Sequence, residues 1–237
     1  MNLLELSGVH THIGAYHILH GVHLTVPRGQ LTMLLGRNGA GKTTTLRTIM
    51  GLWKASQGSI RFGQQDITRL ATPAIARLNI AYVPENMGIF ADLTVKENML
   101  LAARKASNAA QMDTARLEWI FKLFPAVEKF WNHPAGKLSG GQKQMVAVAR
   151  AIVEPRDLLI VDEPSKGLAP AIINNMIDAF DQLKKSGVTI LLVEQNINFA
   201  KRLGDTVAVM DNGQVVHAGS MAELAEVLQQ SLLGLAL

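Results

Sequence analysis

The chain has 237 residues, of which 48% are hydrophobic, a formal net charge of +4 and no cysteine. Its length allows a full hydrophobic core, and the absence of cysteine excludes disulfides, a thiolate metal site and a cysteine nucleophile. No apolar run approaches the ~18–20 residues that span a bilayer, and the Lys and Arg residues are scattered, so we expect no nucleic-acid partner.

The first part of the chain is predicted to contain three strands and a helix. Val22, Leu24 and Val26 alternate with other residues, which is the period-2 pattern of a strand. A short apolar run ends at Gly36, as a buried strand would. The predicted elements are strands at 3–9, 21–26 and 30–35 and a helix at 43–50.

The rest of the chain divides into a helical segment and a second set of strands. Thr94 with Glu97, and Ser220 with Glu223, have capping-box spacing, so a helix is predicted to begin at each place. Strands are predicted at 80–83, 158–161, 189–193, 207–210 and 214–216, the last two joined by a tight turn at 211–213. The simplest interpretation is one domain in which an α/β core (1–85 and 154–237) is interrupted by a helical lobe (86–153).

Residues 36–43 fit the phosphate-binding pattern G-x-x-x-x-G-K-[ST]. Glycines let the backbone curl around an anion, and the helix after the loop directs its positive dipole end to the same place. Lys42 would reach the β- and γ-phosphates, which also makes it a catalytic candidate, and the Thr43 hydroxyl would bind Mg²⁺. The predicted nucleotide-binding residues are Gly36, Arg37, Asn38, Gly39, Ala40, Gly41, Lys42, Thr43 and Thr44.

Residues 158–163 form an apolar strand that ends in two carboxylates. Asp162 would hold Mg²⁺ through water, and Glu163 would polarise the attacking water. Phosphoryl transfer depends mostly on positioning and electrostatics, so a carboxylate near the γ-phosphate suits it. Strands often end in acidic residues by chance, and the pattern gains its weight from the phosphate-binding loop beside it.

Residues 138–142 read Leu-Ser-Gly-Gly-Gln. Ser139 and Gln142 have capping-box spacing before the helical pattern at 144–152. The segment therefore puts a helix N-terminus, two glycines and a hydroxyl at an exposed tip, which predicts a second anion site on the same chain. The alternative is an ordinary helix start that contains glycine.

This last segment resembles, letter for letter, the signature of the ABC ATPases. The resemblance covers nearly the whole chain and is closest to the LivF-like ATPases of branched-chain amino-acid importers. It implies a P-loop NTPase fold with a RecA-like core, an antiparallel β subdomain and an inserted helical subdomain. The segments that carry it are 36–43, 82–85, 93–95 with 97–98, 138–142, 162–165 followed by 167–170, and 192–196.

The resemblance also implies how such a chain works. Ser139, Gly140, Gly141 and Gln142 would bind the γ-phosphate of an ATP held by a second subunit, so that two ATPs lie between two subunits. The second subunit is a sister chain or another copy of this one. Hydrophobic permease subunits in the membrane are the other partners, which places the chain peripherally on the cytoplasmic face of the inner membrane.

Three positions depart from the wider ABC pattern. Glu85 stands where Gln is usual, and it keeps an oxygen available for Mg²⁺. Gln195 stands at the switch position, where His is usual; an amide can donate a hydrogen bond to phosphate but cannot carry a proton at neutral pH. Ala169 replaces an Asp that couples the subunits in many relatives. Glu163 is therefore the stronger base candidate, and Gln195 is a catalytic candidate beside it.

Two further interpretations stay open. Alignment with the family puts Ile13 where relatives stack an aromatic on adenine, and Tyr16 could substitute or be a surface tyrosine. Met87, Ile89 and Phe90 come after Glu85, where relatives meet their membrane subunits, and they form either an apolar docking groove or plain core. Rival functions are import of urea or amides, lipid export, and a soluble ABC ATPase outside transport.

Overall fold

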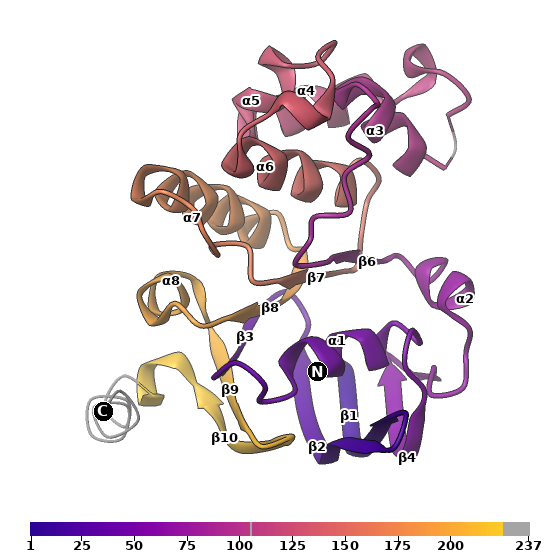
Figure 1. Cartoon of the computed structure of the whole chain (residues 1–237), viewed down its shortest axis with the longest axis vertical. Coiled ribbons are helices and arrows are strands. Elements are labelled where there is room, and N and C mark those ends of the chain that lie inside the picture. The colour runs from indigo at the N-terminus through magenta and orange to yellow at the C-terminus, as the bar shows by residue number, and fades with distance from the viewer. Residues whose placement is uncertain (105, 225–237) are drawn as a thin grey trace.

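A six-stranded sheet runs through the centre of the molecule (Figure 1). The computed structural model describes residues 1–104 and 106–224. The strand order is β10-β9-β3-β8-β7-β6, parallel except for β10, which pairs with β9 in antiparallel fashion. The strands are β3 (Leu31–Gly36), β6 (Ile80–Val83), β7 (Leu158–Asp162), β8 (Thr189–Glu194), β9 (Thr206–Asp211) and β10 (Gln214–Ser220).

Both faces of this sheet are buried, which explains its continuous apolar strands. Side chains alternate along a strand, so Leu31, Met33 and Leu35 enter one core while Leu34 enters the other. All five residues of β7 are buried. Such runs are typical of parallel strands covered on both sides. The strands predicted from 30–35 to 214–216 are confirmed with small changes in their ends.

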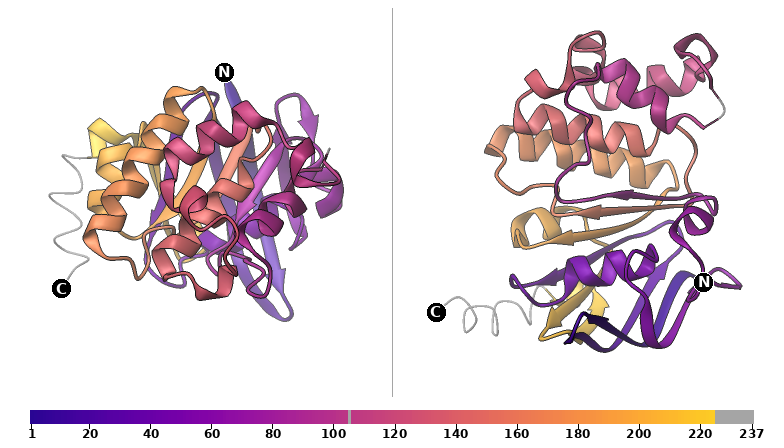
Figure 2. Two further views of the ribbon diagram at one scale, coloured as in Figure 1. Left: turned by 90° about the horizontal axis from the view of Figure 1, so that it is seen from above. Right: turned by 45° about the vertical axis from the view of Figure 1, so that its right-hand side comes forward.

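Helices cover one face of the sheet. The side view in Figure 2 shows α6 (Gly140–Ala151) and α7 (Pro170–Lys185) between the sheet and the helices above them. The buried side of α7 carries Met176, Phe180 and Leu183 at helical spacing. Together with α8 (Ile197–Leu203) these helices share one core with the odd-numbered residues of β3.

The other face packs on a smaller antiparallel sheet and on α1 (Lys42–Ile49). Its strand order is β2-β1-β4-β5. The strands are β1 (Asn2–Ile13), β2 (Tyr16–Pro27), β4 (Ala55–Phe62) and β5 (Gln65–Asp66), after which comes the short α2 (Thr72–Ala76). β1 and β2 are longer than predicted because they meet in a turn at Gly14, whose φ is +59°. β4 was not predicted, because its residues show no clear alternation of apolar and polar side chains. It is recognisable as a strand through its pairing with β1.

The described residues between 86 and 153 form helices, with one isolated bridge between Thr94 and Pro134. Besides α6 they are α3 (Val95–Ala102), α4 (Thr114–Leu123) and α5 (Pro125–Lys129), with 3₁₀ turns at Ala109–Gln111 and Ala135–Lys137. Both predicted capping boxes here are confirmed, at Thr94 before α3 and at Ser139 before α6. The reciprocal bonds of Ser220 and Glu223 are also present, at 3.0 and 3.2 Å, although residues 225–237 lie outside the described part of the chain.

Within residues 1–104 and 106–224, no helix has the length and apolar character needed to cross a membrane.

Candidate functional site

The loop at 36–41 leads from β3 into α1 and depends on its glycines. A Cβ on Gly36 would lie 2.5 Å from the carbonyl oxygen of Met210, so a side chain cannot fit there. Gly39 and Gly41 have φ values of +83° and +103°, which disfavour other residues. Nothing lies within 4 Å of where a Cβ would be on Gly39, so the loop stays open on that side.

Lys42, the first residue of α1, turns back over this loop. Its side chain is buried, and its Nζ donates to the carbonyl oxygens of Gly36 at 2.8 Å and Arg37 at 3.0 Å. The same nitrogen lies 3.5 Å from Oε1 of Glu163. An ammonium group held over a glycine-rich loop at a helix N-terminus makes this loop a candidate anion-binding site.

Thr43 and Asp162 meet because β3 and β7 both flank β8, so their carboxyl ends lie at one edge of the sheet. The Thr43 hydroxyl donates to Oδ1 of Asp162 at 3.2 Å, and the Tyr82 hydroxyl donates to Oδ2 at 3.4 Å. Burial raises the pKa of Asp162 to about 6; the Thr43 hydrogen bond opposes this rise, and the carboxylates of Glu163 and Glu85 add to it. Burial, with the charge of Asp162, also raises the pKa of Tyr82 to about 12.

This oxygen pair fits a hard divalent cation. Mg²⁺ takes oxygen ligands and usually keeps several waters, so a hydroxyl and one carboxylate are a suitable protein contribution. The pKa of the Asp162 carboxyl is raised because it is buried with no positive charge among the described residues to offset its own. A bound metal ion would supply that charge. The residues present therefore fit Mg²⁺, and Thr43 and Asp162 are the candidates to hold it.

Asp162→Asn is expected to stabilise the nucleotide-free protein at pH 7.5 by about 1–3 kcal/mol. The carboxyl holds its proton more tightly in the folded chain than in the unfolded one, so folding stability falls as the pH rises from about 4 to about 6. The amide has no such cost. Urea unfolding without nucleotide at pH 7.5 and at pH 4 measures the difference, which should vanish at the lower pH.

Asp157→Asn is the matched control, since Asp157 is exposed just before the opposite end of β7. It should give no gain in unfolding free energy at pH 7.5. An Asp162→Asn protein that is less stable than wild type at pH 7.5 would contradict the assigned cost of burial.

Glu163, the next residue, has an unusual backbone conformation. Its φ of +48° is rare for a residue other than glycine and is typical of functional positions. Its backbone N–H donates to the carbonyl oxygen of Val193 at 3.0 Å. The side chain is 8% exposed, and its Oε1 accepts a hydrogen bond from Nε2 of Gln195 at 2.6 Å. The Gln195 amide also donates to Oδ1 of Asn38 at 2.7 Å, so three separate loops meet here.

Lys166 is a site residue that the sequence patterns did not indicate. Its Nζ lies 2.5 Å from Oε1 of Glu85 and 3.6 Å from Oε2 of Glu163. The hydrogen bond to Glu85 raises the pKa of Lys166. In this structure the carboxylate of Glu85 is therefore paired with an ammonium group at the edge of the site. A signal for Lys166 that the sequence did offer is its position three residues after Glu163.

The remaining predicted residues lie apart from this cluster. Ser139 and Gln142 are engaged in the capping box of α6, and Gly141 packs against Ile172 of α7. Among the described residues no hydrogen bond or ion pair joins 139–142 to the loop at 36–43. Ile13 and Tyr16 pair across the β1–β2 turn, with Tyr16 75% exposed, so the stacking residue stays a prediction.

Comparison with known proteins identifies relatives of this chain. A family model described as "ABC transporter" matches residues 19–166. BraG of Pseudomonas aeruginosa, a high-affinity branched-chain amino acid transport ATP-binding protein, is 40% identical over 90% of this chain and 91% of its own. LivF of Archaeoglobus fulgidus is 35% identical, covering 89% of each chain. The ATP-binding cassette MJ0796, solved as a dimer with ADP and Pi, superposes with a TM-score of 0.81 and 25% identity, covering 92% of this chain and 98% of its own.

Proposed function

This chain belongs to the ABC transporter family, and we propose that it is the ATP-binding and ATP-hydrolysing subunit of an importer for branched-chain amino acids. One observation carries the proposal. Lys42, the Thr43–Asp162 pair and the Glu163–Gln195 pair converge at one edge of the central sheet, although they come from three separate segments. The similarity to BraG and LivF supports the solute class, because both are named for branched-chain amino-acid transport.

We assign the binding of ATP to the loop at 36–44. Its backbone N–H groups and the Lys42 ammonium would neutralise the phosphate chain, and Thr43 with Asp162 would hold Mg²⁺. When bound, Mg²⁺ supplies positive charge against the developing charge of phosphoryl transfer. Glu85 stays a third candidate ligand, and in this structure its carboxylate is paired with Lys166.

Hydrolysis is assigned to Glu163 and Gln195. Glu163 would accept the proton of the attacking water, and the ammonium groups of Lys42 and Lys166 lie 3.5 and 3.6 Å from its carboxylate oxygens. Gln195 holds Oε1 of that carboxylate and can turn its amide to a phosphate oxygen. Gln195 cannot relay protons, so Glu163 is the proton acceptor in this site.

The signature segment is proposed to act on a second subunit. Ser139–Gln142 lies at an α6 N-terminus, and a Cβ added at Gly140 would meet nothing within 4 Å, so its backbone can approach a phosphate group closely. The dimeric MJ0796 structure with ADP and Pi supports a paired arrangement for this chain as well. Two sites would then form between two subunits, each with a loop from one and a signature from the other.

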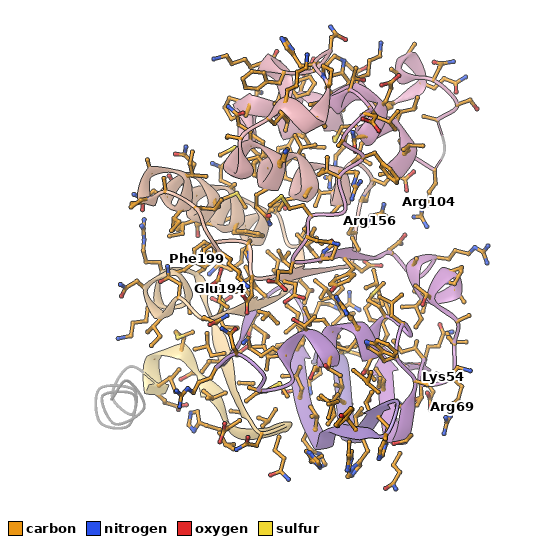
Figure 3. All side chains as sticks on the ribbon, viewed as in Figure 1. Lys54, Arg69, Arg104, Arg156, Glu194 and Phe199 are labelled. Atoms are coloured by element: carbon orange, nitrogen blue, oxygen red, sulfur yellow. The ribbon has the colours of Figure 1, made fainter. Side chains whose placement is uncertain are left out.

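We further propose that the core (1–85 and 154–237) binds nucleotide and that the lobe (86–153) helps to dock on permease subunits at the cytoplasmic face of the membrane. Between α2, β6, α3 and α6 lies a hollow of about 260 Å³ that combines apolar residues with Arg104, Arg150 and Arg156. Figure 3 labels two of these arginines beside the lobe. Phe90, 54% exposed, extends the apolar surface, whereas Met87 and Ile89 are half-buried against the core.

Co-purification tests this proposal. The chain should be recovered from detergent-solubilised membranes together with two hydrophobic subunits, and the reconstituted complex should take up leucine when ATP is present. Recovery only with ribosomes or DNA would contradict transport. Recovery with permeases that move urea, an amide or a lipid would retain the motor and overturn the solute.

A further inference from the structure

Glu194 is a buried carboxylate that neither binds nucleotide nor takes part in the hydrolysis assigned to Glu163 and Gln195. It is the last residue of β8 and is 2% exposed. Figure 3 labels it together with Phe199 of α8. Glu194 makes no ion pair with the residues that the structure describes. Burying an unpaired carboxylate is costly, and a neutral residue of similar size would avoid the cost.

Three backbone N–H groups satisfy this carboxylate. Its Oε1 accepts from Ser165 at 2.9 Å, and its Oε2 accepts from Gln195 at 3.1 Å and from Asn196 at 3.2 Å. Burial raises the pKa of Glu194, while the hydrogen bonds with Ser165 oppose the rise. Hydrogen bonds to an ionised acceptor are roughly twice as strong as neutral ones.

These bonds join the two loops that carry the reacting side chains. Ser165 lies between Glu163 and Lys166 in the loop after β7, and Gln195 begins the loop after β8. The loop after β7 is also bonded to β8 itself, through the Glu163 N–H that donates to the carbonyl oxygen of Val193, and the Gln195 amide donates to Glu163. Glu194 therefore adds a further link between the segment that carries Glu163 and the segment that carries Gln195.

We propose that Glu194 is a positioning residue for ATP hydrolysis: its carboxylate clamps the loop after β7 to the loop after β8 and so holds the Gln195 amide on Glu163. This inference rests on the proposed ATPase function. It assigns Glu194 no contact with nucleotide, and its effect must therefore appear in kcat and pass through Gln195.

Glu194→Gln is the direct test. The side chain keeps its shape, but its NH₂ group must face the N–H of Ser165 or those of Gln195 and Asn196, and two donors repel each other. We expect kcat for ATP hydrolysis to fall about tenfold, which is less than the ~100-fold that a 1 Å misplacement can cost. The KM for ATP and the Kd of a fluorescent nucleotide should stay within about twofold.

A double-mutant cycle with Gln195→Ala separates positioning from a general structural role. If Glu194 acts through Gln195, adding Glu194→Gln to the Gln195→Ala protein should change kcat by less than about twofold. Additive losses would show that Glu194 does not act through Gln195 and would overturn the proposal.

Asp205→Asn is a carboxylate-to-amide control outside the site, although Asp205, unlike Glu194, is also ion-paired, with Lys184 at 3.0 Å. Asp205 also accepts a backbone N–H, that of Leu31 at 2.8 Å, but at the opposite end of the sheet. The same carboxylate-to-amide change there should lower Tm and leave kcat within about twofold.

Glu194→Asp gives a second route. Aspartate keeps the negative charge, but its side chain is shorter by one CH₂ group. The carboxylate then cannot reach both loops, so kcat should again fall. Wild-type kcat in both folded variants, or failure of both to fold, would overturn the positioning role. A wild-type protein that does not hydrolyse ATP would instead contradict the proposed function, so the two failures are distinguishable.

Discussion

Replacing Glu163 with Gln is expected to lower ATP hydrolysis by at least about 100-fold while nucleotide binding is retained, because removing a general base typically costs 10²–10⁴-fold. The amide has almost the same shape, but it cannot accept the proton of the attacking water. The carboxylate is held at 2.6 Å from the Gln195 amide and 3.5 Å from the Lys42 ammonium, so its position is specified from two sides. Phosphate release under saturating Mg-ATP measures the loss.

Glu85→Gln tests the rival carboxylate under the same conditions. Glu85 is paired with Lys166 at the exposed edge of the site, whereas Glu163 is buried beside Lys42. We expect the smaller loss at Glu85. Wild-type hydrolysis in Glu163→Gln, or a larger loss in Glu85→Gln, would contradict the assignment of the base.

Lys42→Ala is expected to weaken ATP binding by at least about 100-fold, because charged hydrogen bonds contribute about 1.5–3 kcal/mol each and Lys42 is placed to make more than one with phosphate. In the nucleotide-free protein the same change removes the cation beside the buried Glu163 and leaves the carbonyls of Gly36 and Arg37 without their donor. Titration of a fluorescent nucleotide into the folded variant measures the Kd.

Lys54→Ala is the control for charge alone. Lys54 is exposed just before β4 and is labelled at the outer edge of the molecule in Figure 3. It should bind ATP like wild type. An unchanged Kd in Lys42→Ala would show that the loop at 36–43 is not the phosphate-binding site.

The two lysines of the site differ in how visible they are in the sequence. Lys42 belongs to a contiguous pattern whose spacing reflects the geometry of a loop at a helix N-terminus. Lys166 belongs to no such pattern, and its partner Glu85 lies 81 residues away. Their pairing depends on β6 and β7 being neighbours in the sheet. Side-chain partners of that kind become predictable only when the strand order is known.

Glu194 illustrates the same limit. In the sequence it is one residue of the segment at 192–196 that carries the family resemblance, and only its neighbour Gln195 stands out as a departure from the family pattern. Its partner Ser165 is 29 residues away, in the loop after the adjacent strand β7. Nothing local distinguishes a buried carboxylate that binds three N–H groups from an exposed one at a strand end.

By itself the sequence determined what depends on residues close to one another in the chain: the glycine loop with Lys42, the strand that ends in Asp162 and Glu163, and the capping boxes at Thr94 and Ser139. Each arises from local backbone geometry or from a period of 2 or 3.6. The tertiary structure alone decided which loops meet, namely Gln195 on Glu163, Lys166 on Glu85 and Glu194 on Ser165. Those contacts are set by the order of parallel strands, which brings distant carboxyl ends to one edge of the sheet.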